Sequence, residues 1–169
     1  MDKVAAEFIE QSISKIEKNT PKLTKCLDQL TDEQVWMRPN EASNSIGNIV
    51  LHLCGNIRQY AISALGNQPD IRERDKEFSA TSGYTKEELL KKLVDTLQEA
   101  IAIIRNTDEV GLLKIYSAQG FNYSGAGIVV HVTEHYSYHT GQIIFWTKQL
   151  TGTDLGFYSH IDLNKRNRS

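Results

Sequence analysis

Three histidines spaced four residues apart are the side chains of this sequence best suited to chemistry. His131, His135 and His139 occur in one stretch, in a chain that has 5 histidines in all. Residues four apart lie nearly one above the other on an α-helix, because each residue turns the helix by about 100°. Neutral imidazole is a common ligand of divalent metal ions, so this spacing predicts a helix that presents metal ligands along one face.

Two pairs from this run could bind a metal ion, depending on the register. His131, Glu134 and His135 match the pattern H-x-x-E-H of inverted zinc proteases, in which the glutamate is the general base. Such proteases need a distant carboxylate ligand and a larger fold than the short remainder of this chain offers, and so short a pattern also recurs by chance. In the second register, His135 and His139 share one helix face with Gln142. The spacing alone leaves both registers open.

Apolar residues at helical spacing predict four long helices in this chain. They span about residues 3–30, 44–66, 85–104 and 124–150. Pro21 is expected to kink or break the first helix, because proline has no amide hydrogen to donate. Thr31 and Gln34 match a capping box that opens a short additional helix, and Thr85 and Glu88 match a second one. Four amphipathic helices with modest connections predict an all-α fold, an antiparallel four-helix bundle.

The connecting segments are less regular. Residues 67–83 are polar and are expected to form a loop, whereas residues 111–123 could form a minor strand segment or an extended loop. The basic residues 165–168 are expected to be a solvated end. Residues 1–169 are expected to form a single domain, because a chain of this length is too short for two sizeable cores.

A fourth histidine is predicted to face the histidine run. On the second helix, His52 lies on the same side as Asn56 and Tyr60, and this side faces the interior of the bundle. His135 and His139 also lie on an inward stripe, so three imidazoles from two facing helices could meet in one cavity and leave coordination positions open. The alternative for His52 is a hydrogen-bonded core residue, since a lone buried histidine is more often that than a ligand.

Three segments of the chain resemble the DinB/YfiT-like superfamily of four-helix metalloproteins. They are residues 30–39, residues 44–53 and residues 131–143, in the order that the family shows and over most of the chain. The last segment contains the pattern H-x-x-x-H-x-x-x-H-T-G-Q. The resemblance implies that the metal ligands are His52, His135 and His139. It also implies that His131 does not bind the ion and instead packs beside the site.

The resemblance also implies a range of functions. Relatives include thiol S-transferases that use bacillithiol, mycothiol-dependent isomerases and proposed hydrolases, and an open three-histidine site can lower the pKa of a bound thiol or water. We therefore expect a metal-dependent transferase that activates a low-molecular-weight thiol toward an electrophilic substrate. Hydrolysis of a small substrate and a non-catalytic metal-binding or stress-response role are the alternatives. Zinc or nickel is the expected ion, with iron or manganese also compatible, and the resemblance implies a homodimer.

Residues that act beside the metal are not identified by the sequence, and Gln142, Asn56 and Tyr60 are the catalytic candidates. Gln142 could hydrogen-bond a ligand or substrate, or could simply be solvated. Asn56 and Tyr60 follow the second-helix histidine by one and two turns and could line the cavity. Gln119 and Gly120 could form its rim. Other polar residues are expected to lie away from the metal, namely Arg58, Glu134 and Cys54.

Composition excludes several classes of function. The formal net charge is -2 and the pI is about 6.2, so the chain lacks the basic field of a nucleic-acid-binding protein. No apolar run approaches the roughly 20 residues that span a bilayer, and the first residues do not resemble a signal peptide. We expect a cytoplasmic protein without nucleic-acid or membrane partners. Cys26 and Cys54 lack metal or redox spacing and are expected to be reduced, buried structural residues.

Overall fold

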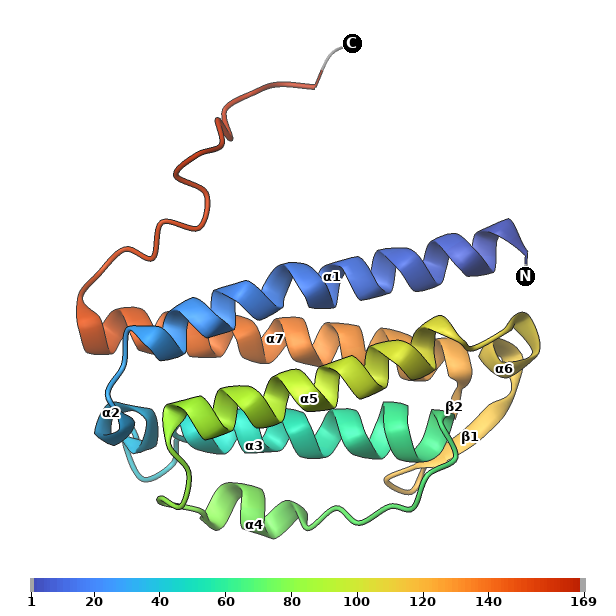
Figure 1. Cartoon of the computed structure of the whole chain (residues 1–169), viewed down its shortest axis with the longest axis horizontal. Helices are drawn as coiled ribbons and strands as arrows, with labels where there is room; N and C mark the ends of the chain where they lie inside the picture. Colours follow the sequence, from blue (N-terminus) through green and yellow to red (C-terminus); the bar gives the residue numbers. More distant parts are fainter. Residues whose placement is uncertain (1, 168–169) are drawn as a thin grey trace.

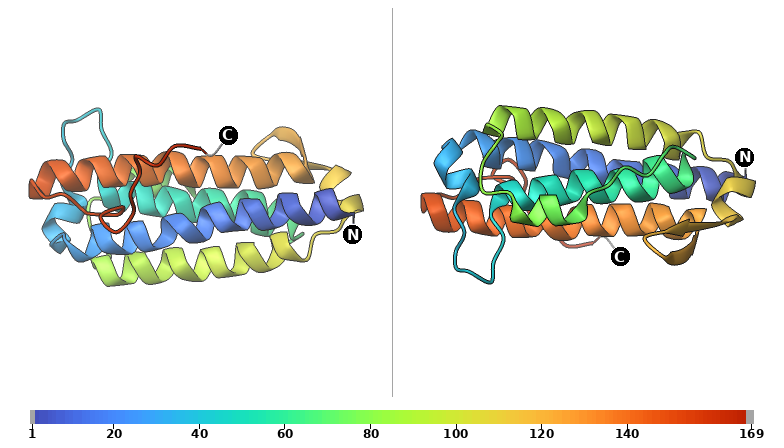
Figure 2. Two further views of the ribbon diagram at one scale, coloured as in Figure 1. Left: turned by 90° about the horizontal axis from the view of Figure 1, so that it is seen from above. Right: turned by 90° about the horizontal axis from the view of Figure 1, so that it is seen from below.

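Four long helices lie side by side in the structure, a computed structural model that describes residues 2–167 (Figure 1). They are α1 (Lys3–Asp28), α3 (Ile46–Ile57) with its continuation, the π-helix η1 (Arg58–Leu65), α5 (Lys86–Arg105) and α7 (Gly125–Thr151). The predicted all-α four-helix bundle is therefore confirmed. Helices α1 and α7 run in one direction and α3 and α5 run in the other, so the two pairs are antiparallel to each other (Figures 1 and 2).

The predicted capping boxes begin their helices as expected. Thr31 Oγ1 accepts a hydrogen bond from the Gln34 amide at 3.2 Å, and Gln34 Oε1 accepts one from the Thr31 amide at 3.0 Å, at the start of α2 (Asp32–Trp36). Thr85 and Glu88 make the same reciprocal pair at the start of α5. Each box satisfies two amides that have no partner within the helix, and so fixes where the helix begins.

Helix α1 continues through Pro21 without a break. The expected alternative of a break is therefore wrong, and the helix runs from Lys3 to Asp28. Proline cannot donate to the carbonyl of Glu17, four residues earlier. Both residues are exposed, so water can bind that carbonyl, and the helix tolerates the missing hydrogen bond.

A long strap connects the second and third long helices. Residues 66–85 return along the outside of the bundle, which is why α5 can run in the same direction as α3 (Figure 1). The expectation of a plain loop is wrong, because the strap contains helix α4 (Arg74–Ser79). Asn48 Nδ2 donates to the carbonyls of Glu77 at 2.9 Å and Ala80 at 2.7 Å. These bonds satisfy carbonyls at the end of α4 and hold the strap against α3.

A hairpin precedes the last helix. After α6 (Glu109–Leu113), strands β1 (Ile115–Ala118) and β2 (Phe121–Ser124) pair antiparallel, so the minor strand segment is confirmed. The turn residues Gln119 and Gly120 have φ of 53° and 80°, as a two-residue turn of this hairpin type requires. Strand β2 then leads directly into α7.

Beyond α7 the chain continues as an irregular segment that first packs on α1, where Lys22 Nζ donates to the Tyr158 hydroxyl at 3.2 Å, and then extends away from the bundle (Figure 1). Leu155 is buried there, whereas residues 165–167 are exposed, as expected for the basic end. Residue 168, the last member of that basic stretch, lies outside the described residues. None of the described helices is long and apolar enough to cross a lipid bilayer.

Candidate metal centre

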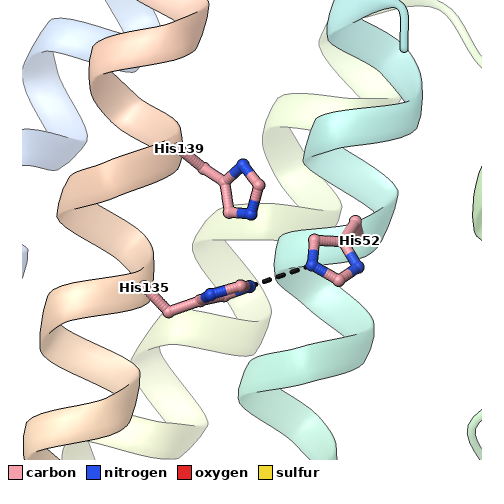
Figure 3. A group of neighbouring side chains, drawn as sticks. All are labelled: His52, His135 and His139. Atoms are coloured by element: carbon pink, nitrogen blue, oxygen red, sulfur yellow. Dashed lines mark hydrogen bonds between the residues drawn. The ribbon is translucent and has the colours of Figure 1, made fainter. Parts of the chain in front are cut away.

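Three imidazoles from two facing helices meet between α3 and α7 (Figure 3). His52 Nε2 lies 2.9 Å from His135 Nε2. The ring centroid of His139 lies 5.0 Å from that of His52 and 4.4 Å from that of His135. One nitrogen from each ring lies within 4.8 Å of the others, so the structure brings together the three residues proposed as ligands.

The separation of these nitrogens fits one metal ion. Zinc–imidazole bonds of about 2.0–2.1 Å in a tetrahedral site place neighbouring nitrogens about 3.3 Å apart. The observed range, from 2.9 Å for His52 and His135 up to 4.8 Å, brackets that distance, so small ring rotations suffice. His52 is buried and the other two rings are half-buried, which leaves one side of the cluster open.

The protonation of the cluster also suits a metal. Burial, followed by the charges of His139 and His52, lowers the pKa of His135 to about 3. Burial likewise lowers the pKa of His139. Both side chains are therefore neutral near pH 7, which is the form of imidazole that binds metal ions.

A carboxylate orients the first imidazole. Glu77 is only 8% exposed, and its Oε2 accepts a hydrogen bond from His52 Nδ1 at 3.1 Å. This bond leaves the Nε2 lone pair of His52 directed at His135. Histidine ligands in metalloproteins commonly donate their second nitrogen to a carboxylate in this way, which fixes the tautomer and the ring orientation.

Arg72 keeps this carboxylate charged. Arg72 Nε donates to Glu77 Oε1 at 2.7 Å, and its terminal nitrogen donates to Oε2 at 2.8 Å. Burial alone would raise the pKa of Glu77, but the hydrogen bonds from Arg72 and His52 outweigh it and hold the pKa below its usual value. The strap thus contributes a buried ion pair to the wall of the site.

Sequence reasoning missed Arg72 and Glu77. Both lie in the segment expected to be a polar loop, and their place beside His52 depends on the path of the strap. Phe78, whose ring centroid lies 4.9 Å from that of His52, is the one signal in that segment, because an aromatic residue there suggests packing. Gly55 supplies the room, since a Cβ at this position would collide with the Glu77 carboxylate.

Gln142 orients the third imidazole. Its Oε1 accepts from His139 Nδ1 at 2.6 Å, and its amide nitrogen donates to the Tyr138 hydroxyl at 3.2 Å. His139 Nε2 is then available to an ion, just as His52 Nε2 is. The structure therefore places this catalytic candidate beside a proposed ligand.

His131 lies one layer away from the three imidazoles. Its Nε2 accepts from Asn56 Nδ2 at 3.2 Å, and its ring stacks on Tyr60 with centroids 3.9 Å apart. Glu134 is exposed on the flank of α7, about 100° around the helix from His135, in a groove beside α1. The protease-like register thus lacks its general base at the cluster, and His131 packs beside the site.

The remaining sequence candidates lie at the edges of this region. Tyr60 donates its hydroxyl hydrogen to Gln119 Oε1 at 3.2 Å, which places the hairpin turn against the layer of His131. Arg58 pairs with Glu99 at 2.8 Å on the surface. Cys54 is buried toward α5, and burial raises its pKa to about 12.

Comparison with known proteins places the chain in a family. The profile of DUF1572, described as a protein of unknown function, matches residues 3–162. The chain belongs to this family. DUF1572 is a DinB-like family, so the resemblance to that superfamily is confirmed.

Two solved structures share the fold of this DUF1572 protein. A DinB-like protein (YjoA) from Bacillus subtilis is 18% identical with a TM-score of 0.67, over 88% of this chain and 96% of that one. A DinB-like protein from Bacillus cereus is 17% identical with a TM-score of 0.65, over 83% of this chain and 91% of that one. At such identities the likeness shows the fold alone. The comparison with curated proteins finds no match.

Proposed function

We propose that this DUF1572 protein is a divalent-metal-dependent transferase that joins a low-molecular-weight thiol to an electrophilic substrate. The observation that carries the proposal is the convergence of His52, His135 and His139, with an open side, inside a DinB-like bundle. Zinc or nickel suits this all-imidazole set best, and iron or manganese is also compatible.

The three imidazoles would hold the ion and leave its charge unreduced, because none of them carries a negative charge. When bound, the ion would supply a positive charge that lowers the pKa of a thiol in contact with it. Glu77 fixes the ring of His52 and Gln142 fixes the ring of His139, so both present Nε2. The paired charges of Arg72 and Glu77 cancel. The site therefore favours an anionic partner such as a thiolate.

A thiol from outside the chain is required because the cysteines of the protein are unsuited to the reaction. Burial raises the pKa of Cys54 to about 12 and also raises that of Cys26, so both remain protonated near neutral pH. Both residues are buried in the hydrophobic core. In the proposed reaction, the added thiol loses its proton to solvent and its sulfur forms a bond to the electrophilic carbon. The leaving group departs with the bonding electrons.

The proposal is tested by a transfer assay on untagged protein reconstituted with Zn²⁺ or Ni²⁺. Monochlorobimane is the electrophile, and cysteine, coenzyme A, glutathione and bacillithiol are the thiols. We expect thiol-dependent fluorescence that a chelator abolishes and added metal restores. Turnover of ester substrates with water alone would favour the hydrolase alternative. Tight metal binding without any turnover would favour the non-catalytic role.

We also propose that the protein is a homodimer. Val130, Tyr138 and Phe145 are 53%, 57% and 64% exposed along one outer face of α7. Exposed apolar side chains gathered on one helix face are typical of an interface. Light scattering during size-exclusion chromatography tests this proposal, and a monomer at micromolar concentration would contradict it.

A further inference from the structure

A buried amide beside the three imidazoles lacks a partner. Asn56 is 3% exposed, and within residues 2–167 its Oδ1 is the buried side-chain atom that has no hydrogen-bond partner. Its Nδ2 is already used, because it donates to His131 Nε2. A buried acceptor without a donor costs free energy. Because the other buried polar side-chain atoms of residues 2–167 have hydrogen-bond partners, this exception indicates a place where another molecule donates a hydrogen bond.

This acceptor lies next to the candidate metal centre. Asn56 follows His52 by four residues on α3, and His131 precedes His135 by four residues on α7. Because the two helices are antiparallel, both steps lead in the same direction along the bundle (Figure 1). Asn56 and His131 therefore form a layer four residues, about 6 Å, from the layer of His52 and His135.

The side chains that line this layer are mostly aromatic. Tyr60 stacks on His131 with an interplanar angle of 21°, and its hydroxyl is fixed by Gln119 at the hairpin turn. Tyr123 closes the same side, with its ring centroid 5.7 Å from that of Tyr60. Tyr60 belongs to η1, which begins two residues after Asn56. Helices of this π type are rare and occur frequently at functional sites.

We propose that Asn56 is a specificity-determining residue that accepts a hydrogen bond from an N–H or O–H group of the small thiol. The inference rests on the proposed function, in which the thiol sulfur occupies the site of the three imidazoles. The ligand class is then a thiol whose donor group lies a short carbon chain from the sulfur. The half-buried ring of His131 packs against that chain.

Two thiols that differ in one group test the inference. N-Acetylcysteamine carries an amide N–H, and mercaptoethyl acetate carries an ester oxygen in the same position. The protein is loaded with Co²⁺, and each thiol is titrated while the sulfur-to-cobalt charge-transfer absorbance is recorded. We expect the amide thiol to bind about tenfold more tightly, which corresponds to one buried hydrogen bond of about 1.4 kcal/mol.

The outcomes separate the inference from the proposed function. If neither thiol produces the absorbance, the proposed function fails before Asn56 is tested. If both bind with equal affinity, the thiol proposal survives and the inference about Asn56 is overturned. Tighter binding of the ester also overturns it, since the amide of Asn56 would then present its N–H₂ group to the ligand.

A variant tests whether Asn56 causes the preference for the amide thiol. Asn56→Leu keeps the number and branching of the side-chain heavy atoms and removes the acceptor, so we expect the two thiols to bind equally and the cobalt content to remain at the wild-type level. Asn122→Leu, on the exposed face of β2, is the matched control and should keep the tenfold preference. A preference that persists in Asn56→Leu contradicts the inference.

Discussion

Replacing Glu77 by glutamine removes the negative charge that orients His52 while keeping the shape of the side chain. Glu77 Oε2 lies 3.1 Å from His52 Nδ1, and no other described carboxylate contacts that ring. Mutation of the carboxylate that orients a histidine ligand typically weakens metal binding by about 10–100-fold, which corresponds to about 1.4–2.7 kcal/mol. We expect the Kd for zinc to rise by this factor in Glu77→Gln.

The same change leaves a buried cation without its partner. The side chain of Arg72 is 3% exposed and its ion pair is with Glu77. Breaking one side of a buried ion pair costs about 3–5 kcal/mol, so the metal-free variant should lose stability on that scale. Replacing both residues, in Arg72→Met with Glu77→Leu, should restore much of the stability but not the zinc affinity, because His52 still lacks a carboxylate.

Competition with a chromophoric zinc chelator measures the affinity, and urea unfolding of the metal-free protein measures the stability. Glu41→Gln, at an exposed position in the loop before α3, is the matched control for the loss of one carboxylate charge. Zinc affinity in Glu77→Gln within twofold of the wild type would refute the reasoning that this carboxylate orients the ligand.

Three further predictions follow from the site. In Gly55→Ala, the added methyl group collides with the Glu77 carboxylate, so the strap should loosen and zinc affinity should fall, as measured by the same competition assay. An unchanged affinity would show that the Glu77 carboxylate does not lie so close to Gly55. The folded-state pKa of His135, about 3, lies below the unfolded value of about 6.5, so the unfolded state takes up a proton first as the pH falls. The metal-free protein should therefore lose stability between pH 6.5 and pH 3, on the order of 2 kcal/mol by pH 5, and urea unfolding at constant stability would contradict this. A Cys26→Ser and Cys54→Ser double variant should keep its metal and its transfer activity, and loss of transfer with the metal retained would implicate a protein thiol.

Local signals predicted much of this fold. The boxes at Thr31 and Thr85 fix helix starts because both partners lie within four residues. The stacking of His135 and His139 on one face likewise depends only on helical geometry. Such features need no knowledge of the rest of the chain, and the four-helix class followed from them.

Features that depend on the path of the chain could not be predicted. The contact of Glu77 with His52 joins residues 25 apart through the strap, and no local pattern encodes that approach. The change from α3 to η1 at Arg58 also escaped prediction, because its sequence has ordinary helical periodicity. The parallel direction of α3 and α5 follows from the length of the strap, which periodicity does not reveal.

Metal stoichiometry tests the central claim most directly. Wild-type protein, His139→Ala and His131→Ala are dialysed against Zn²⁺ or Ni²⁺, and the bound metal is determined by mass spectrometry. The account predicts one ion per chain in the wild type and in His131→Ala, and loss of the ion in His139→Ala. Loss in His131→Ala with retention in His139→Ala would contradict the assignment of His52, His135 and His139 as ligands.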